Sequence, residues 1–427
     1  MRGVVAIALG AAAAAVWLGA PASAQEVEFW NLGDASVKTF SEAAARSFED
    51  QSGTRVEARI IPNEAYKTAM QVAMGAGNQP DVFFNWGGED TFRFVRAGQL
   101  RDVTEAARAA GVPAAQLTPY SREGRAYGVP LTQHTVMFFY NREMFAKVGV
   151  EPPETLGELA EVCRAIRRAD EDLIPITLGA KEPWTITHYL TMLFTRFVPA
   201  DVRAADDALS AEDAQLFTHP GYEDAFAAMR SLQDARCFNR GINSVNPEEA
   251  RAFFGAEISA MTFCGTWCLD PIDRDGMKDR YGLFPMPVAP DGKGDQEAAF
   301  IVVEGLQVAA NTDQPEAAEA FLAHMVSAEV QALMVRQLGR LPVNADALSM
   351  ADTTQAFDVA VRALTSAPRT VMPLDMTMDN AVGQAIYVGG QEFVNRTKTA
   401  DEVMGDVRRA ALRAKARRAR QSGAGSP

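Results

Sequence analysis

The stretch that decides the fold is Gln79-Pro80-Asp81-Val82-Phe83-Phe84-Asn85-Trp86-Gly87-Gly88. Three consecutive apolar residues, Val82 to Phe84, predict a short strand that is buried on both faces. The strand stops at a polar side chain, a large indole and two glycines. Ligands of open α/β sheets bind just beyond the strand ends, so Asn85 and Trp86 are candidate ligand-binding residues. The alternative is that Trp86 only caps the hydrophobic core, as many aromatic side chains do.

The residues before this stretch complete an alternating pattern of strands and helices. Residues 27–30 and 55–61 are strand-like, and residues 37–48 and 63–75 carry apolar side chains at helical spacing. The order β-α-β-α-β predicts a mainly parallel sheet with right-handed crossovers. The fold class that we expect is therefore α/β.

The first 24 residues are expected to be a secretory signal peptide. Arg2 gives a positive start, Val4 to Leu18 is an apolar run, and Ala22-Ser23-Ala24 is a small-residue cleavage pattern. The run is too short and too rich in alanine for a good membrane span. We expect cleavage after Ala24 and a periplasmic protein.

The length and charge of the remaining chain limit its organisation and its partners. About 400 residues are too many for one ordinary hydrophobic core, which predicts two lobes. Loss of Arg2 moves the formal charge from −14 to −15, which argues against nucleic acid and anionic membranes as main partners. We expect an N-terminal lobe, a C-terminal lobe and a disordered tail, formed respectively by residues 25–132 plus 282–345, by residues 133–281 plus 346–420, and by residues 421–427.

The chain has four cysteines: Cys163, Cys237, Cys264 and Cys268. Export permits disulfides, but four cysteines allow three full pairings and the sequence cannot choose among them. Cys163 lies on an apolar helical face, so we expect a buried free thiol there. A bridge among the other three remains open. The Cys264-x3-Cys268 spacing is not that of a zinc site, and we expect neither a metal nor a cofactor.

Five further motifs follow one another in a recognisable order. They are Gly77-Asn78-Gln79-Pro80-Asp81-Val82-Phe83-Phe84, Tyr127-Gly128-Val129-Pro130, Phe139-Tyr140-Asn141-Arg142-Glu143-Met144-Phe145, Pro153-Glu154-Thr155-Leu156-Gly157-Glu158-Leu159, and Phe253-Phe254-Gly255 through Met261 to Gly265-Thr266-Trp267. Together they resemble the family 1 extracellular solute-binding proteins of ABC importers, the maltodextrin-binding type. The resemblance extends over nearly all of the chain after the signal peptide.

This resemblance implies the type II periplasmic-binding-protein fold, in which each lobe is a mainly parallel sheet flanked by helices and a hinged cleft lies between. It implies a monomeric, non-enzymatic carrier that binds a sugar and delivers it to the permease transmembrane subunits. Phe84 to Gly88 and Lys181-x-x-Trp184-x-x-x-His188 are most similar to binders of raffinose and xylo-oligosaccharides. Two features depart from the family pattern: Cys264 and Cys268 flank the hinge tryptophan, and residues 368–380 hold no aromatic residue.

Sugar binding needs aromatic platforms beside carboxylates, amides and imidazoles that fix the hydroxyl groups. The four tryptophans after the signal peptide all lie at strand ends or in loops, and polar residues accompany them. Each polar residue also has a structural alternative, such as helix capping for Asp34 and Asp375, a turn position for Asn85, or surface pairing for Glu304. The candidate ligand-binding residues are Trp30, Asn31, Asp34, Asn85, Trp86, Thr132, Gln133, His134, Glu182, Trp184, His188, Trp267, Glu304 and Asp375.

Two other functions compete with sugar transport. One is the binding of a different solute, such as a polyol, glycerol phosphate or a polyamine. The other is a secreted glycoside hydrolase with paired carboxylates, for instance Asp34 and Glu182. The sequence contains no nucleophile elbow, phosphate loop or metal-binding HExxH motif, which favours a binding protein over an enzyme.

Overall fold

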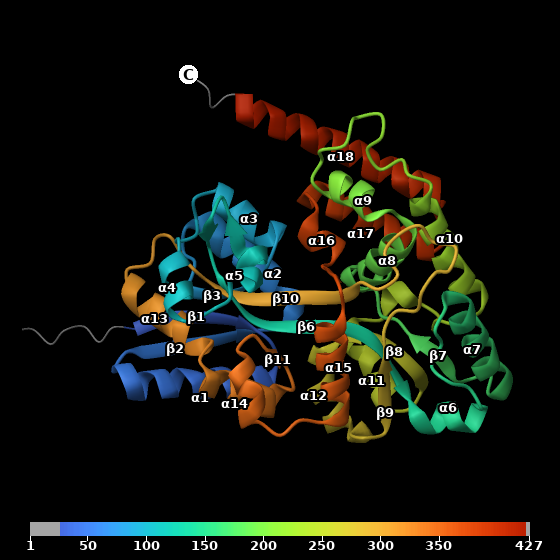
Figure 1. Cartoon of the computed structure of the whole chain (residues 1–427), viewed down its shortest axis with the longest axis horizontal. Helices are drawn as coiled ribbons and strands as arrows, with labels where there is room; N and C mark the ends of the chain where they lie inside the picture. Colours follow the sequence, from blue (N-terminus) through green and yellow to red (C-terminus); the bar gives the residue numbers. More distant parts are fainter. Residues whose placement is uncertain (1–25, 424–427) are drawn as a thin grey trace, which may run out of the picture.

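The computed structural model describes residues 26–423. Two lobes lie side by side, and strands β6 (Val129–Asn141) and β10 (Ala299–Val308) run across the middle of the molecule between them (Figure 1). The predicted signal peptide and its cleavage site lie outside the described residues. Within residues 26–423, no helix has both the length and the apolar composition needed to cross a bilayer.

The first lobe begins with the expected alternation of strands and helices. Its opening elements are β1 (Glu26–Leu32), α1 (Ala35–Ser52), β2 (Arg55–Ile61), α2 (Asn63–Ala76) and β3 (Val82–Trp86). Strand β1 pairs in parallel with both β2 and β3. The predicted strand at Val82 is therefore confirmed, and it is buried along its whole length.

Helices cover both faces of this part of the sheet. On one face, the ring of Phe29 lies 5.2 Å from that of Phe321 in α13 (Pro315–Met325). On the other face, the Tyr66 hydroxyl of α2 donates a 2.6 Å hydrogen bond to the Phe84 carbonyl. The remaining elements of this lobe are α3 (Glu89–Arg96), α4 (Thr104–Ala109), α5 (Ala114–Leu117), β4 (Ser121–Arg122), β5 (Arg125–Ala126), α14 (Ala328–Leu338) and β11 (Leu341–Pro342).

One sheet continues through both lobes, in the order β2-β1-β3-β10-β6-β8-β7. The first half of β6 pairs antiparallel with β10, and its second half, from Val136 to Tyr140, pairs antiparallel with β8 (Ser259–Gly265). Strand β7 (Ile174–Thr177) then pairs in parallel with β8. The lobes are thus joined by backbone hydrogen bonds as well as by the chain itself.

The second lobe surrounds the far end of this sheet with helices. These are α6 (Arg142–Val148), α7 (Leu156–Ala169), α8 (Trp184–Phe197), α9 (Ala200–Asp207), α10 (Gly221–Asp234), α11 (Pro247–Gly255) and α12 (Leu269–Ile272). The expected cap of α7 is confirmed, because the Thr155 hydroxyl accepts from the Glu158 amide in a capping box.

Strand β9 (Tyr281–Phe284) lies where we did not expect it. The sequence places residues 282–345 in the N-terminal lobe, but β9 pairs with Phe138 to Asn141, in the same half of β6 that pairs with β8. Its apolar residues predict a strand but carry no information about which neighbour the strand will pair with.

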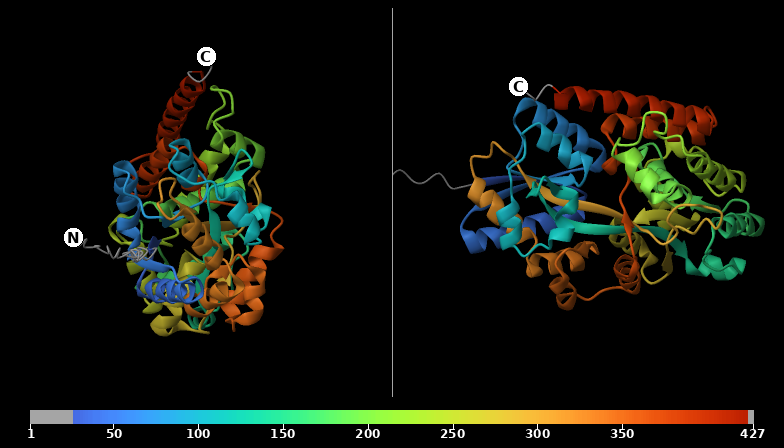
Figure 2. Two further views of the ribbon diagram at one scale, coloured as in Figure 1. Left: turned by 90° about the vertical axis from the view of Figure 1, so that its left-hand side faces the viewer. Right: turned by 45° about the horizontal axis from the view of Figure 1, so that its top comes forward.

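The chain closes with α15 (Gln355–Ser366), β12 (Thr370–Val371), α16 (Leu374–Thr377), α17 (Asn380–Val394) and α18 (Ala400–Gly423). Helix α18 lies along one edge of the molecule and reaches the first lobe (Figure 2), where Arg418 Nη2 lies 4.0 Å from Glu89 Oε2. We expected residues 421–427 to be disordered. Helix α18 instead continues to Gly423, and residues 424–427 lie outside the described part of the chain.

All four cysteines are paired. Cys163 in α7 bonds to Cys237, and Cys264 at the end of β8 bonds to Cys268. The expectation of a free Cys163 thiol was wrong: an apolar helical face predicts burial, and Cys163 is fully buried, but it cannot reveal that a second buried cysteine faces it.

Loss of the Cys163–Cys237 bridge should destabilise the fold. The bridge closes a loop across 74 positions, so the variant Cys163→Ala/Cys237→Ala should lose about 2–4 kcal/mol of unfolding free energy through the greater freedom of its unfolded chain. Urea unfolding of the variant and the parent protein measures the difference. Equal midpoints and slopes would contradict this expectation.

Candidate functional site

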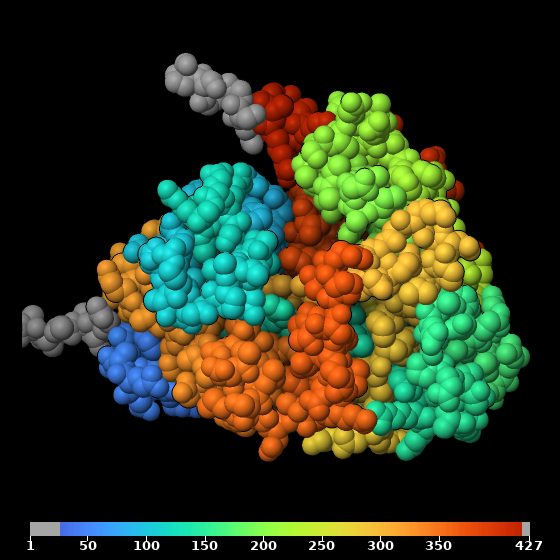
Figure 3. Space-filling view, in the orientation of Figure 1, coloured from blue at the N-terminus to red at the C-terminus, as the bar shows by residue number. Residues whose placement is uncertain are grey.

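The space-filling view is hollowed between the two lobes (Figure 3). Several predicted site residues meet beside the strands that cross this junction. His134 lies on β6, Trp267 follows the end of β8, and Trp184 and His188 occupy successive turns at the start of α8. We call these four residues the tryptophan–histidine cluster. Elements far apart in the sequence thus place four of the candidates in one group.

The rings of the tryptophan–histidine cluster contact one another, mostly edge to face. The Trp267 centroid lies 5.0 Å from that of His134, 6.2 Å from that of Trp184 and 5.9 Å from that of His188. Trp184 and His188 are one helical turn apart, and their centroids lie 4.9 Å apart. Both histidines are buried, whereas both indoles are half-buried, so the indoles are the members with surface left to offer a ligand.

A buried ion pair supports the cluster from the crossing strands. Glu304 of β10 accepts a hydrogen bond from His134 at 3.1 Å, and Arg340 Nη1 lies 3.4 Å from the same oxygen. The ionised carboxylate can only accept, so His134 carries its proton on Nε2, and Nδ1 accepts a hydrogen bond from the Thr266 hydroxyl at 3.0 Å. This network fixes the His134 ring against Trp267.

The surroundings of the two histidines and Glu304 determine their protonation states. Burial raises the pKa of Glu304, but His134 and Arg340 outweigh it and the pKa lies below its usual value. Burial lowers the pKa of His134 despite the nearby carboxylate, and burial alone lowers the pKa of His188 to about 3. At neutral pH both imidazoles are therefore neutral and the Glu304 carboxyl is ionised.

Two polar atoms beside the cluster are buried without a hydrogen-bond partner among the described residues: Trp184 Nε1 and Glu182 Oε2. A buried polar atom without a partner costs about 1–3 kcal/mol. Trp184 Nε1 is a hydrogen-bond donor and Glu182 Oε2 is an acceptor. Trp184 is the first residue of α8, and Glu182 lies two residues before it. A ligand with hydroxyl groups could satisfy both.

Three carboxyl groups, from both lobes, lie near one another where the lobes meet. Burial raises the pKa of Glu182, and Glu64 of α2 raises it further. Partial burial likewise raises the pKa of Glu248 in α11, and the nearby carboxyls of Glu64 and Glu182 raise it further. We call Glu64, Glu182 and Glu248 the carboxylate trio. It brings like charges together where the first lobe meets the second.

Further contacts tie the lobes together. Asp34 caps α1, as one sequence alternative held, because its carboxylate accepts from the Ser36 and Val37 amides. Its other oxygen lies 3.2 Å from Arg274 of the second lobe. At Gly88, where φ is +80°, an added Cβ would lie 2.1 Å from the carbonyl oxygen of Met376 in α16, so the loop after β3 approaches the second lobe at a position that favours glycine.

Several other candidates use their polar atoms inside the protein. The Asn31 amide donates to Ser41, the Asn85 amide to Gln307 and the Asp90 carbonyl, and the Thr132 hydroxyl to the Leu341 carbonyl. Asp375 accepts from the hydroxyls of Tyr387 at 2.5 Å and Thr187 at 3.4 Å. The polar side-chain atoms of these four residues are therefore used in holding the fold together.

The two tryptophans of the first lobe are packed against cations. The Arg59 guanidinium lies 4.6 Å from the Trp30 ring, and the Trp30 indole donates to Glu28. Lys67 Nζ lies 4.6 Å from the Trp86 ring. Both indoles are about nine-tenths buried. Gln133, also a candidate, is half-buried and opposes Val303 and Leu341 in the crossing sheet.

Sequence reasoning missed Thr266, Glu64 and Glu248. Thr266 lies inside the quoted Gly265-Thr266-Trp267 motif, so its place beside Trp267 was available as a signal. Glu64 and Glu248 stand in the first turns of helices, where acidic residues are common for local reasons. Nothing in the sequence indicates that these two turns face each other.

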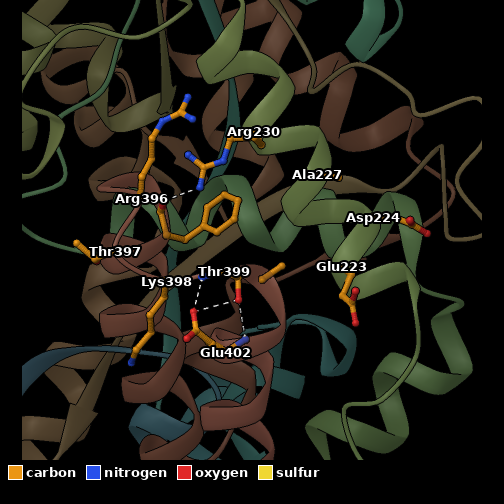
Figure 4. A pocket seen from close by; sticks show the side chains of 11 residues that line it. Glu223, Asp224, Ala227, Arg230, Arg396, Thr397, Lys398, Thr399 and Glu402 are labelled. Carbon is orange, nitrogen blue, oxygen red and sulfur yellow. Dashed lines mark hydrogen bonds between the residues drawn. The ribbon is translucent and has the colours of Figure 1, made fainter.

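Another surface hollow, with a volume of about 610 Å³, lies away from the lobe junction, between α10 and the segment that joins α17 to α18 (Figure 4). Its basic groups, Arg230, Arg396 and Lys398, are already paired. Arg230 donates to the Phe393 carbonyl at 2.9 Å, and Lys398 lies 2.7 Å from Glu392 and 2.8 Å from Asp406. This hollow is therefore a poorer candidate site than the lobe junction.

The variant Glu304→Gln should lose about 3 kcal/mol of unfolding free energy at pH 7, because it leaves the Arg340 charge buried without its partner. The lowered pKa of Glu304 means that the ionised carboxyl stabilises the fold above pH 4.5 and that this contribution is lost as the pH falls through the folded pKa. Parent and variant should therefore converge in acid. Urea unfolding at several pH values measures this, with Glu143→Gln, in the more exposed pair with Arg280, as the control. A control as destabilised as the variant would contradict the expectation.

The variant Glu248→Gln should be more stable at pH 7 than its matched control Glu316→Gln, by under about 1 kcal/mol. Both residues follow a proline at the first position of a helix, so the helix-dipole effect cancels. A raised pKa means that the ionised form is disfavoured above it, and this cost disappears as the pH falls through it. The difference in stability between the two variants should therefore shrink in acid. Thermal unfolding of both variants at several pH values measures it, and a difference that does not change with pH would contradict the expectation.

Comparison with known proteins identifies the family of this chain. Residues 33–332 match the family model of the bacterial extracellular solute-binding proteins. An uncharacterised extracellular-binding protein of an ABC transporter from Pyrococcus horikoshii is 21% identical over 89% of this chain and 85% of its own length. A multiple sugar-binding protein from Streptococcus mutans is 23% identical over 61% of this chain and 62% of its own.

Solved structures show the same fold at low sequence identity. A chitin oligosaccharide binding protein has a TM-score of 0.83 at 20% identity, covering 92% of this chain and all of its own. A protein studied for xylan utilisation by Caldanaerobius polysaccharolyticus has a TM-score of 0.82 at 21% identity, over 90% of this chain and 99% of its own. A solute-binding protein in complex with raffinose has a TM-score of 0.75 at 18% identity, over 91% and 99%. The family match covers well over half of the chain, which therefore belongs to the bacterial extracellular solute-binding proteins.

Proposed function

We propose that this chain binds a short oligosaccharide between its two lobes and delivers it unchanged to the permease subunits of an ABC importer. The observation that carries the proposal is the tryptophan–histidine cluster. Its half-buried indoles suit the apolar faces of a sugar ring, and the unpartnered Trp184 Nε1 and Glu182 Oε2 suit its hydroxyl groups. The similar multiple sugar-binding, chitin oligosaccharide, xylan and raffinose proteins support the same ligand class.

Closure of the lobes on the ligand would provide the signal for delivery. Residues from both lobes reach the junction, so a ligand that contacts both stabilises the closed form over the open form. We propose that the protein acts outside the cytoplasm as a monomer, after removal of its signal peptide. The hydrolase alternative loses support because the Asp34 carboxylate already binds two amides and Arg274.

A polyamine is the second candidate ligand. The observation that favours it is the carboxylate trio, since three facing carboxyls beside indoles are a suitable environment for an ammonium group. A sugar would leave this like-charge repulsion unrelieved, whereas a cation would relieve it. The two ligand classes can be separated by titration.

The variants Trp184→Ala and Trp267→Ala should each weaken sugar binding by about 2 kcal/mol, or roughly 30-fold, if each indole packs on the ligand. The measurement is calorimetric titration with raffinose, xylo-oligosaccharides, chito-oligosaccharides and spermidine. Trp30→Phe is the control, because Trp30 lies under Arg59 and away from the tryptophan–histidine cluster.

Three outcomes would count against the proposal. Binding of spermidine but of no sugar would establish the polyamine alternative instead. Release of shorter sugars during the titration would establish hydrolysis. Unchanged affinity in both tryptophan variants would place the ligand elsewhere in the molecule.

A further inference from the structure

The bridge between Cys264 and Cys268 encloses the turn that carries Trp267. It joins two residues only four positions apart and so closes a small ring of backbone around Gly265, Thr266 and Trp267. Both sulfur-bearing residues are buried, at 9% and 3% exposure. They pack in an apolar group with Met137 and Leu269 and others, beneath the junction of the lobes.

The bridge begins where the backbone ladder ends. Strand β8 pairs with β6 from Met261 to Gly265, and Gly265 opposite Val136 is the last pair. Beyond it, Thr266 is held by its hydroxyl to His134. The bridge therefore supplies, for the residues after the strand, a constraint that the sheet no longer provides.

The indole of Trp267 folds back over this turn. A Cβ added at Gly265 would lie 2.1 Å from the Trp267 ring, so the ring lies against the backbone of its own turn, and residue 265 must be glycine for it to do so. The ring contacts that hold Trp267 from outside, to His134, His188 and Trp184, have centroid distances of 5.0, 5.9 and 6.2 Å. Such edge-to-face contacts are individually weak, and they would not by themselves keep a half-buried indole in one orientation.

We propose that the Cys264–Cys268 bridge is a positioning element of the ligand site: it holds Trp267 in the orientation in which the indole meets both the ligand and the rest of the tryptophan–histidine cluster. This inference rests on the proposed function for its effect on affinity. A side chain that is ordered before binding does not lose its freedom on binding, so the bridge raises affinity through preorganisation.

The two disulfides of this chain should therefore have different roles: Cys163–Cys237 mainly stabilises the fold, and Cys264–Cys268 mainly raises affinity for the ligand. The Cys163–Cys237 bridge closes a far longer loop and limits the unfolded chain more, but it joins α7 to the segment after α10, away from the tryptophan–histidine cluster. The Cys163–Cys237 bridge therefore serves as the control for removal of the Cys264–Cys268 bridge. Opening it should lower the melting temperature more and the affinity less than opening the Cys264–Cys268 bridge.

The first experiment measures affinity. Cys264→Ala/Cys268→Ala should weaken binding of the tightest sugar in the panel roughly fivefold to tenfold, the expected effect of freeing one large side chain. Cys163→Ala/Cys237→Ala should leave the dissociation constant within about twofold of the parent value. In the Trp267→Ala background, opening the Cys264–Cys268 bridge should have no further effect. An equal loss with and without Trp267, or no loss at all, would overturn the inference.

The second experiment needs no ligand. Acrylamide quenching of tryptophan fluorescence should increase when the Cys264–Cys268 bridge is removed from the parent protein, because the Trp267 indole becomes more mobile and exposed. It should not increase when Trp267 is already alanine. If the alanine pair does not fold, Cys264→Ser/Cys268→Ser replaces it. Unchanged quenching in the parent would reject the positioning role, whereas a parent protein that binds no sugar would reject only the proposed function.

Discussion

The rest of the structure depends on the fact that one strand belongs to both lobes. Strand β6 gives its first half to β10 and its second half to β8 and β9, so the hydrogen-bond ladder that completes one lobe begins the other. The register of this strand fixes where His134 stands relative to Glu304 and to the turn after β8. Because successive residues of a strand face opposite sides, a slip of one position would turn His134 away from Trp267. The site is in this sense a product of strand register.

A sheet shared in this way explains why a buried charge is tolerated at the junction. Glu304 is 7% exposed, and ionised groups are rarely so buried without partners. Its partners arrive from β6 and from the loop after α14, which are two separate parts of the chain. Such networks add little net stability, but moving one member out of place leaves a buried charge without its partner, which is costly. They therefore suit a place where a few side chains must keep one arrangement while the surrounding lobes move.

The sequence was sufficient to predict the parts of the fold that are decided locally. Val82 to Phe84 forms the expected strand, and Asp34 and Thr155 cap the expected helices. The grouping of Trp184 with His188 also follows from their spacing alone. What the sequence could not predict depends on distant partners: the Cys163–Cys237 bridge, the neighbour that β9 selects, and the meeting of Glu64 with Glu248. Asn85 shows the same limit, since its amide is directed to Gln307, a residue more than two hundred positions away.

The central position of β10 also affects how the chain is made. Strand β3 has β1 on one side, but its other neighbour is β10, and about 200 residues must be synthesised after Trp86 before Ala299 appears. At roughly 5–20 residues per second, this leaves an unpaired strand edge in the nascent chain for about ten to forty seconds. During that time the first lobe cannot finish folding. The first lobe thus cannot complete its sheet until about two thirds of the chain has been made, and the unpaired edge of β3 is prone to non-native pairing until then.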